Sequence, residues 1–129
     1  LANNTNYAMT GGQLAPTTLP GQKTETTPLG RDPESTGYPV MGPEMISAIT
    51  GAGAYVARGT VSKYRQLKGF IKRALQNQME GNGFSFVEAL STCPTNWGTN
   101  AKQTWNWLED NMQAYFPTGE LKSPFRKED

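Results

Sequence analysis

The sequence contains no histidine and only one cysteine among its 129 residues. The absence of histidine excludes a Ser-His-Asp or Cys-His triad, and any histidine-ligated zinc site, within the chain. A single cysteine cannot form an internal disulfide, and it suits a reducing compartment. No apolar run approaches the roughly 20 residues that are needed to span a bilayer. We therefore expect a cytoplasmic chain with no membrane partner.

The chain also lacks an excess of charge of either sign. Its 12 lysines and arginines are balanced by 11 aspartates and glutamates, which gives a net charge of +1. Proteins that bind nucleic acid usually carry a strong basic excess, because they neutralise phosphates. The composition therefore predicts no nucleic-acid partner.

Turn-forming residues are concentrated in the first part of the chain. Of the 23 glycines and prolines, 14 precede Ala54. Residues 1–40 therefore form a long loop region, which is either a mobile tail or a functional loop, because structureless loops of this length are uncommon inside compact domains. Leu1 and Ala2 indicate the end of a further strand. We expect that more of the sheet lies upstream and that this chain is the C-terminal part of something larger.

The middle of the chain has the pattern of a βαβ unit. The expected elements are a short helix over residues 45–49, a strand over 54–61, an amphipathic helix over 63–80, a strand over 84–91 and a last helix over 100–116. Two strands joined by a helix are parallel neighbours with a right-handed crossover. The fold class is therefore α/β, a parallel sheet with flanking helices, followed by a polar tail over residues 117–129.

Ligands bind outside the carboxyl ends of the strands in an open parallel sheet. Three segments follow such ends, residues 3–13, 58–62 and 92–98, and we expect them to converge on one edge. In the first segment, asparagine oxygens suit Mg²⁺, and the N–H groups of two glycines beside Thr10 could approach a phosphate. A structural turn is the alternative there. Cys93, in the third segment, is either a buried small residue, a reactive thiol or a soft-metal ligand.

Other conspicuous side chains have structural interpretations. Arg58 could meet a phosphate or a carboxylate, or form a surface ion pair, and Glu88 is expected in a pair or at an edge. Trp105 is expected in the core. The helix over residues 63–80 is expected to pack along one stripe, and its basic face to be solvated. That stripe consists of Tyr64, Leu67, Ile71, Ala74, Leu75 and Gln78.

Two runs of sequence carry a resemblance to a known family. The first is Tyr-Ala-Met-Thr-Gly-Gly-Gln at residues 7–13, with Ala-Pro-Thr at residues 15–17. The second is Phe-Val-Glu-Ala-Leu-Ser-Thr-Cys-Pro-Thr-Asn-Trp-Gly at residues 86–98. In this order they resemble the β subunit of 2-oxoacid:ferredoxin oxidoreductases, of the 2-oxoglutarate or 2-oxoisovalerate type. Residues 54–59 and the basic helix match too, so the resemblance covers nearly the whole chain.

The resemblance implies a partial thiamine diphosphate-binding fold over residues 1–129. Residues 1–40 would be the cofactor loop region, residues 41–116 a βαβ core with its C-terminal helix, and residues 117–129 a tail. Members of the family bind thiamine diphosphate and Mg²⁺, oxidise and decarboxylate a 2-oxoacid to acyl-CoA and CO₂, and reduce ferredoxin through [4Fe–4S] clusters. The implied partners are a pyrimidine-binding α subunit, further subunits, ferredoxin, the 2-oxoacid and CoA.

The resemblance also assigns site residues by position. The Asn4 side chain and the Asn6 backbone carbonyl match the Mg²⁺ ligands, and Cys93 matches one of four [4Fe–4S] ligands, with the other three outside this chain. The segment beside the reactive carbon of the cofactor corresponds to Met9, Thr10, Gly11 and Gly12. Met9 together with Gly11 favours a branched-chain acid. No catalytic residue is expected, because the glutamate that activates the cofactor belongs to the partner.

Two other functions stay open at this point. The chain could be a non-catalytic α/β interaction module that kept the scaffold and lost the site. It could also belong to a thiamine diphosphate synthase or decarboxylase, although Cys93 argues against this because those enzymes need no cluster ligand there. In the main hypothesis the chain is a fragment that is inactive alone. The basic helix face is then a minority candidate for docking acidic ferredoxin. With the site incomplete, residues 3–40 would be mobile or packed against a neighbouring molecule.

Overall fold

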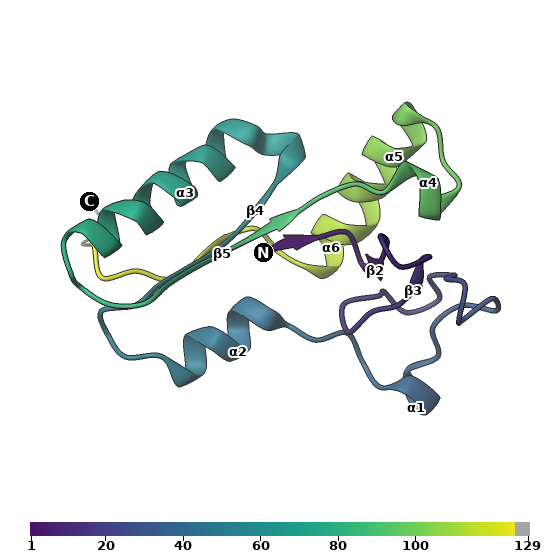
Figure 1. Ribbon diagram of the computed structural model, residues 1–129, viewed down its shortest axis with the longest axis horizontal. Coiled ribbons are helices and arrows are strands. Elements are labelled where there is room, and N and C mark those ends of the chain that lie inside the picture. Colours follow the sequence, from purple (N-terminus) through teal and green to yellow (C-terminus); the bar gives the residue numbers. More distant parts are fainter. Residues whose placement is uncertain (126–129) are drawn as a thin grey trace. The chain divides into compact units, whose positions relative to one another are not determined.

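The computed structural model describes residues 1–125, and the chain forms two compact units (Figure 1). The first unit contains Leu1, residues 42–89 and residues 117–125, and the second contains residues 2–41 and 90–116. We expected residues 41–116 to form one core. Residues 90–116 instead group with the N-terminal loops.

A mixed, mostly parallel sheet has the strand order β1-β5-β4-β6. Strand β4 (Tyr55–Thr60) is buried along its whole length, and β5 (Ser85–Leu90) runs parallel to it (Figure 1). Strand β1 (Ala2–Asn3) lies beyond β5, where the Ser91 N–H donates to the Asn3 carbonyl at 2.8 Å. The α/β class and the βαβ unit predicted from the sequence are confirmed.

Helices α2 (Gly42–Ile49) and α3 (Tyr64–Met79) lie on opposite sides of this sheet (Figure 1). A short 3₁₀ turn, η1 (Val61–Lys63), joins β4 to α3. Phe70 of α3 packs with Tyr55 and Ala57 of β4 in the core. None of the helices within residues 1–125 has both the length and the apolar composition that crossing a bilayer requires.

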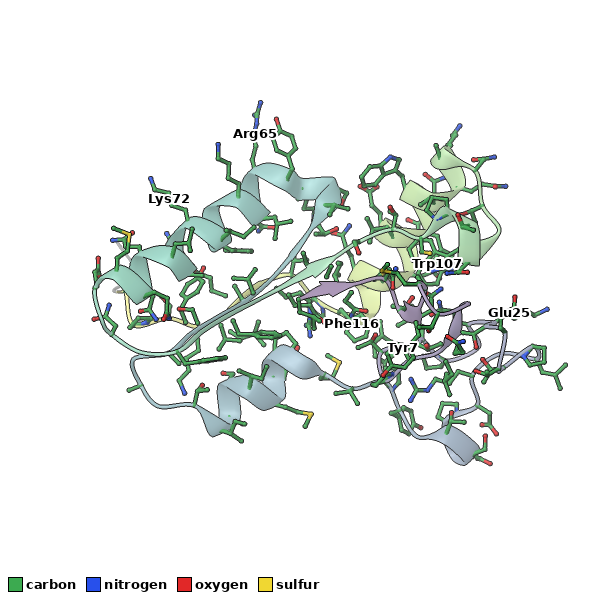
Figure 2. The ribbon with its side chains drawn as sticks, viewed as in Figure 1. Tyr7, Glu25, Arg65, Lys72, Trp107 and Phe116 are labelled. Carbon is green, nitrogen blue, oxygen red and sulfur yellow. The ribbon has the colours of Figure 1, made fainter. Side chains whose placement is uncertain are left out.

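The orientation of α3 differs from the predicted one. Its buried residues are Phe70 and Asn77. Tyr64, Ile71 and Leu75 are 63%, 45% and 61% exposed, so most of the predicted stripe does not face the sheet. The basic side chains Arg65 and Lys72 point away from the sheet, as expected (Figure 2).

The segment after residue 117, which we expected to be a polar tail, contains β6 (Gly119–Lys122). This strand pairs antiparallel with β4, with an irregularity in register between Val56 and Ala57. The Tyr55 hydroxyl donates to Glu120 Oε1 at 2.6 Å, and Lys122 Nζ donates to the Ser47 carbonyl at 3.0 Å. The tail interpretation is therefore corrected for residues 119–122. Residues 126–129 lie outside the described part of the chain.

A buried arginine lies at the centre of the first unit. The Arg58 guanidinium donates to Glu88 Oε2 at 2.5 Å and to both oxygens of Glu44 at 2.7 and 2.6 Å. Burial alone would lower the pKa of Arg58, but its hydrogen bonds to the two carboxylates outweigh burial and raise the pKa above its ordinary value. The buried Arg58 thus meets one buried carboxylate, Glu88, and one partly exposed carboxylate, Glu44, and Glu88 is paired as expected.

The second unit has little regular structure before residue 90. Strands β2 (Asn6–Tyr7) and β3 (Gln13–Leu14) form a hairpin, and α1 (Pro33–Thr36) is a single turn. The later elements are α4 (Pro94–Trp97), α5 (Ala101–Trp107), a π-helical turn η2 (Leu108–Met112) and α6 (Gln113–Tyr115).

The last predicted helix is interrupted, because η2 divides it. Leu108, Met112 and Phe116 are fully buried, whereas Trp105 is 44% exposed. The expectation that Trp105 is a core residue is therefore wrong. The extra residue in the π turn changes which positions of the helix face inward.

The loops of the second unit are organised around Arg31, whose side chain is 5% exposed. Its guanidinium donates to six main-chain carbonyls and to no carboxylate among residues 1–125. These carbonyls belong to Ala15, Pro16, Thr18, Thr36, Gly37 and Tyr38. Residues 15–38 are thus a compact lobe held from inside by one side chain.

Candidate functional site

A glycine-containing loop connects β2 to β3 in the second unit. The two strands pair Asn6 with Leu14 and Tyr7 with Gln13. The Gly12 N–H donates to the Tyr7 carbonyl at 2.8 Å, and the Gly11 N–H donates to the Ala8 carbonyl at 3.3 Å. Both N–H groups are bonded inside the hairpin, and the binding of a phosphate by these glycines stays a prediction.

The two glycines instead permit the shape of the loop. Gly11 has φ +122° and Gly12 has φ +87°, conformations that residues with a side chain rarely adopt. A Cβ atom on Gly12 would lie 2.9 Å from Asn96 Oδ1, so the close approach of this amide also requires glycine.

The tip of the loop is fully open to solvent. Met9 is completely exposed, and Tyr7 at the base of the hairpin is 53% exposed. Thr10 Oγ1 donates to Gln13 Oε1 at 2.7 Å, and Gln13 Nε2 donates to the Thr10 carbonyl at 2.6 Å. The loop therefore presents an apolar thioether on a hydrogen-bonded base, which suits contact with a ligand or a partner.

Asn96 joins this loop to the cysteine segment. Its Nδ2 donates to the Ala8 carbonyl at 3.1 Å and to Cys93 Sγ at 3.3 Å. Trp97 Nε1 donates to the Asn4 carbonyl at 3.3 Å. Two of the three segments that we expected to converge therefore meet in the second unit. The third, residues 58–62, belongs to the first unit.

The two predicted Mg²⁺ ligands lie at the start of this arrangement. The side-chain amide of Asn4 is half-buried and forms no hydrogen bond with the described residues. Asn6 is 8% exposed, and its Oδ1 has no hydrogen-bond partner within residues 1–125. A buried polar oxygen without a partner costs about 1–3 kcal/mol, and a bound cation would remove that cost.

These oxygens fit part of a divalent cation site. Mg²⁺ prefers oxygen ligands in an octahedron, and amide and carbonyl oxygens are suitable members of it. The resemblance assigns the backbone carbonyl of Asn6, and its side-chain oxygen is a further candidate among the asparagine oxygens of residues 3–13. Further ligands, including a carboxylate, would have to come from outside the described residues.

Thr5 lies between these two asparagines in a strained conformation. It has φ +60°, which is a genuine outlier for a β-branched residue and costs about 1–3 kcal/mol. Thr5 is fully buried. Sequence reasoning missed this residue, because no sequence pattern marks a β-branched residue for a left-handed conformation.

Cys93 is a buried free thiol with an exposed fraction of 8%. Within residues 1–125 there is no group of three or more histidine, cysteine, aspartate or glutamate side chains that could hold a metal. The described residues therefore do not fit an iron–sulfur cluster by themselves, and can supply one ligand at most. Beside this segment, the rings of Trp97 and Trp107 lie 4.4 Å apart.

Comparison with protein families identifies the fold. The protein-family model for the C-terminal TPP-binding domain of thiamine pyrophosphate enzymes matches residues 1–89 of this chain. The chain belongs to this family. The partial thiamine diphosphate-binding fold expected from the sequence is thereby confirmed.

Relatives of this TPP-binding chain are subunits of oxidoreductases that act on 2-oxoacids. Ketoisovalerate oxidoreductase subunit VorA of Methanothermobacter thermautotrophicus is 43% identical over 118 residues, which are 89% of this chain and 24% of VorA. The 2-oxoglutarate synthase subunit KorB of the same organism is 42% identical over 99 residues, 74% of this chain and 30% of KorB.

The solved structure of a 2-oxoglutarate:ferredoxin oxidoreductase from Magnetococcus marinus, with 2-oxoglutarate, coenzyme A and succinyl-CoA bound, has the same fold. Its TM-score is 0.70 at 25% identity, covering 98% of the TPP-binding chain and 47% of the solved chain. The resemblance to 2-oxoacid:ferredoxin oxidoreductase subunits is confirmed. The chain spans only a quarter to a third of the VorA and KorB relatives it matches.

Proposed function

We propose that this chain is part of the thiamine diphosphate-binding subunit of a 2-oxoacid:ferredoxin oxidoreductase. The complete enzyme would oxidise and decarboxylate a 2-oxoacid to acyl-CoA and CO₂, with ferredoxin as the electron acceptor. The observation that carries the proposal is the Asn96 amide, which binds the Ala8 carbonyl and Cys93 Sγ together. The loop assigned to the cofactor and the cysteine assigned to a cluster thus share one hydrogen-bonded side chain.

In this proposal, Mg²⁺ is held by the Asn4 side chain and the Asn6 carbonyl, with a carboxylate from outside the described residues. The cation neutralises the diphosphate, and the bound cofactor supplies the nucleophilic carbon for the 2-oxo group. Gly11 and Gly12 shape the loop, and Met9 and Thr10 at its tip face the substrate.

Cys93 would be one of four [4Fe–4S] ligands in the intact subunit, with the other three outside the described residues. Burial of the thiol and the N–H donated by Asn96 suit a cluster ligand, because hydrogen bonds to sulfur are one way in which proteins tune such clusters. The partners would be the pyrimidine-binding α subunit, the remaining subunits and ferredoxin, together with CoA. We place the enzyme in the cytoplasm.

A branched-chain 2-oxoacid such as 2-ketoisovalerate is the substrate we favour over 2-oxoglutarate. The exposed Met9 presents an apolar side chain, and Gly11 beside it adds no bulk or charge. The name of the VorA relative is consistent with this preference. Rates of ferredoxin reduction with the two acids, compared in the purified complex, would decide between them.

The first test is calorimetric titration with thiamine diphosphate and Mg²⁺. It would use this chain, the longest product of the same gene, and that product with its pyrimidine-binding partner. We expect saturable binding at least in the complex, weakened about tenfold or more by Asn4→Ala, since removal of even supporting groups around a metal costs 10- to 100-fold. The exposed Asn111→Ala is the matched control.

Absence of binding in all three preparations would overturn the assignment. The non-catalytic interaction module would then be the better description of the chain. Binding without 2-oxoacid-dependent reduction of ferredoxin would keep the cofactor site and reject the reaction.

A further inference from the structure

Every polar atom of Thr5 is occupied by a specific hydrogen bond. Its N–H donates to Asn3 Oδ1 at 2.9 Å, and its hydroxyl donates to the Asn4 carbonyl at 2.7 Å. Its carbonyl accepts from Thr18 Oγ1 at 2.5 Å, and its hydroxyl also accepts from Gln22 Nε2 at 2.9 Å. The strained residue between the two metal-ligand candidates is therefore fixed from several directions.

The Thr18 hydroxyl has only one way to point. Its oxygen accepts the N–H of Ala15 at 2.9 Å, so its hydrogen is available for the Thr5 carbonyl. Thr18 is fully buried, and water cannot replace either bond without opening the lobe. The side chain thus sets the orientation of the peptide group between Thr5 and Asn6.

Gln22 makes a second connection of the same kind. Its Oε1 accepts the Leu19 N–H at 2.9 Å, which directs its Nε2 to the Thr5 hydroxyl. The Thr5 hydroxyl in turn donates a hydrogen bond to the Asn4 carbonyl. The main chain on the Asn4 side of Thr5 is therefore also held by the lobe.

Arg31 keeps this lobe in register with the Thr5 segment. Nη1 donates to the Thr18 carbonyl at 2.7 Å and to the Ala15 carbonyl at 3.3 Å. The same nitrogen thus binds the carbonyl of Thr18 itself and that of Ala15, whose N–H the Thr18 hydroxyl accepts. Removal of the Thr18 hydroxyl or of the Gln22 side-chain amide would leave Thr5 free to return to an ordinary conformation.

We propose that Thr18 and Gln22 are positioning residues for the divalent cation of the cofactor site. They hold Thr5 in its left-handed conformation, and this conformation sets the Asn4 side chain and the Asn6 carbonyl as a preformed pair of ligands. The inference rests on the proposed function, and adds that the lobe of residues 15–38 prepares the metal site before the cation arrives.

The test uses the assembled enzyme with thiamine diphosphate and Mn²⁺ as a paramagnetic probe for the metal site. Free Mn²⁺ is measured by electron paramagnetic resonance, so activity is not the readout. We expect Thr18→Val and Gln22→Leu each to weaken Mn²⁺ binding about tenfold, and Thr18→Ser to restore it. Thr36→Val is the matched control, because its hydroxyl bonds to the carbonyl of Asp32, the N-cap residue of α1, and not to the Thr5 segment.

A Thr5→Gly background separates positioning from general stability. Glycine adopts a positive φ without strain, so the segment needs less support from the lobe. We expect Thr18→Val to weaken Mn²⁺ binding by less than about threefold in that background. Urea unfolding of each variant shows whether the lobe remains folded.

Three results would overturn the inference. Unchanged Mn²⁺ affinity in both Thr18→Val and Gln22→Leu would make the lobe a structural element only. An equal loss in the native and Thr5→Gly backgrounds would show that Thr18 does not act through Thr5. Absence of Mn²⁺ binding by the unsubstituted enzyme would overturn the proposed function itself, which distinguishes that failure from the other two.

Discussion

The two units each bury one arginine, and they satisfy it in opposite ways. Arg58 in β4 donates to the carboxylates of Glu44 and Glu88, whereas Arg31 donates to six main-chain carbonyls. In the first unit, regular strands and helices fix the backbone, and the arginine completes a charge cluster. In the second unit, the arginine itself fixes the backbone, because its acceptors are in place only when residues 15–38 have the right turns.

The two environments also shift the arginine pKa values in opposite directions. Burial lowers the pKa of Arg31, with a smaller opposing effect from Tyr115, whereas the carboxylates raise that of Arg58. Arginine is effectively always protonated in proteins, so both side chains are charged at neutral pH. Carbonyl dipoles can therefore hold a buried guanidinium without a counter-ion, provided that enough of them converge.

Arg31→Met is expected to produce the largest effect. Hydrogen bonds from a charged group contribute about 1.5–3 kcal/mol each, and water recovers only part of six such bonds. We expect about 5 kcal/mol less protection of amides in residues 15–38, measured by hydrogen exchange, with the first unit little changed. Arg65→Met on the exposed side of α3 is the control. Uniform loss of protection in both units would show that Arg31 does not act locally.

Arg58→Met is expected to cost about 4 kcal/mol in urea unfolding, because it removes the guanidinium that is paired with the buried Glu88 carboxylate. The double substitution Arg58→Met and Glu88→Leu should recover more than half of this loss, since no charge then stays buried. No second substitution can rescue Arg31→Met in this way, because its acceptors are main-chain atoms. If the double variant is no more stable than the single one, the carboxylate is not the source of the cost.

Gly12→Ala is expected to cost about 1–3 kcal/mol, because alanine is strained at φ +87° and its Cβ would displace the Asn96 amide. Gly51→Ala in the first unit is the matched control. It has ordinary φ and no atom within 4 Å of the added Cβ, so its stability should be unchanged. Urea unfolding of the two variants makes the comparison, and equal midpoints would contradict it.

Glu44→Gln tests the pH dependence of the first unit and has the smallest expected effect. Burial would raise the pKa of Glu44, but the hydrogen bond from Arg58, a backbone hydrogen bond and the charge of Arg58 together outweigh burial and lower the pKa below its ordinary value of 4.5. The pair therefore stabilises the fold above pH 4.5, and this contribution is lost as the pH falls through the lowered pKa.

Glu44→Gln should accordingly be less stable than the unsubstituted chain at pH 7 and show a flatter decline in acid. Urea midpoints between pH 7 and pH 3 measure this. Protection of residues 15–38 by Arg31 should not follow the same curve, because Arg31 forms no ion pair with a carboxylate among the described residues. Identical pH profiles of the urea midpoint for Glu44→Gln and the unsubstituted chain would show that Glu44 does not contribute to the pH dependence of stability.

The sequence predicted the regular part of the fold well. The strands expected at residues 54–61 and 84–91 and the helix between them agree with β4, β5 and α3 to within one or two residues. The period of hydrophobic residues and the glycines at the boundaries are enough to predict these elements, because each element has a strong local signal. Strand β6 was missed, since Gly-Glu-Leu-Lys has no strand signal and forms only by pairing with β4.

The candidate site was predicted from a sequence motif shared with a family, and not from the physical properties of its residues. The asparagine and glycine positions and Cys93 were named from a resemblance, and the structure adds that Asn96 connects them. Asn96, Thr18 and Arg31 have no local signal, because their partners include carbonyls of residues 13 or more positions away in the sequence. Such contacts depend on backbone geometry, which hydrophobic patterns do not encode.

The adjacent, mutually tilted rings of Trp97 and Trp107 give the chain an optical property of its own. Indoles whose centres are 4.4 Å apart and tilted by 43° couple as chromophores, which should produce a paired circular-dichroism band in the near ultraviolet. The Trp97 N–H is also bonded to the carbonyl of Asn4. Any movement of that peptide would therefore alter the absorption of light by a native side chain, with no label attached.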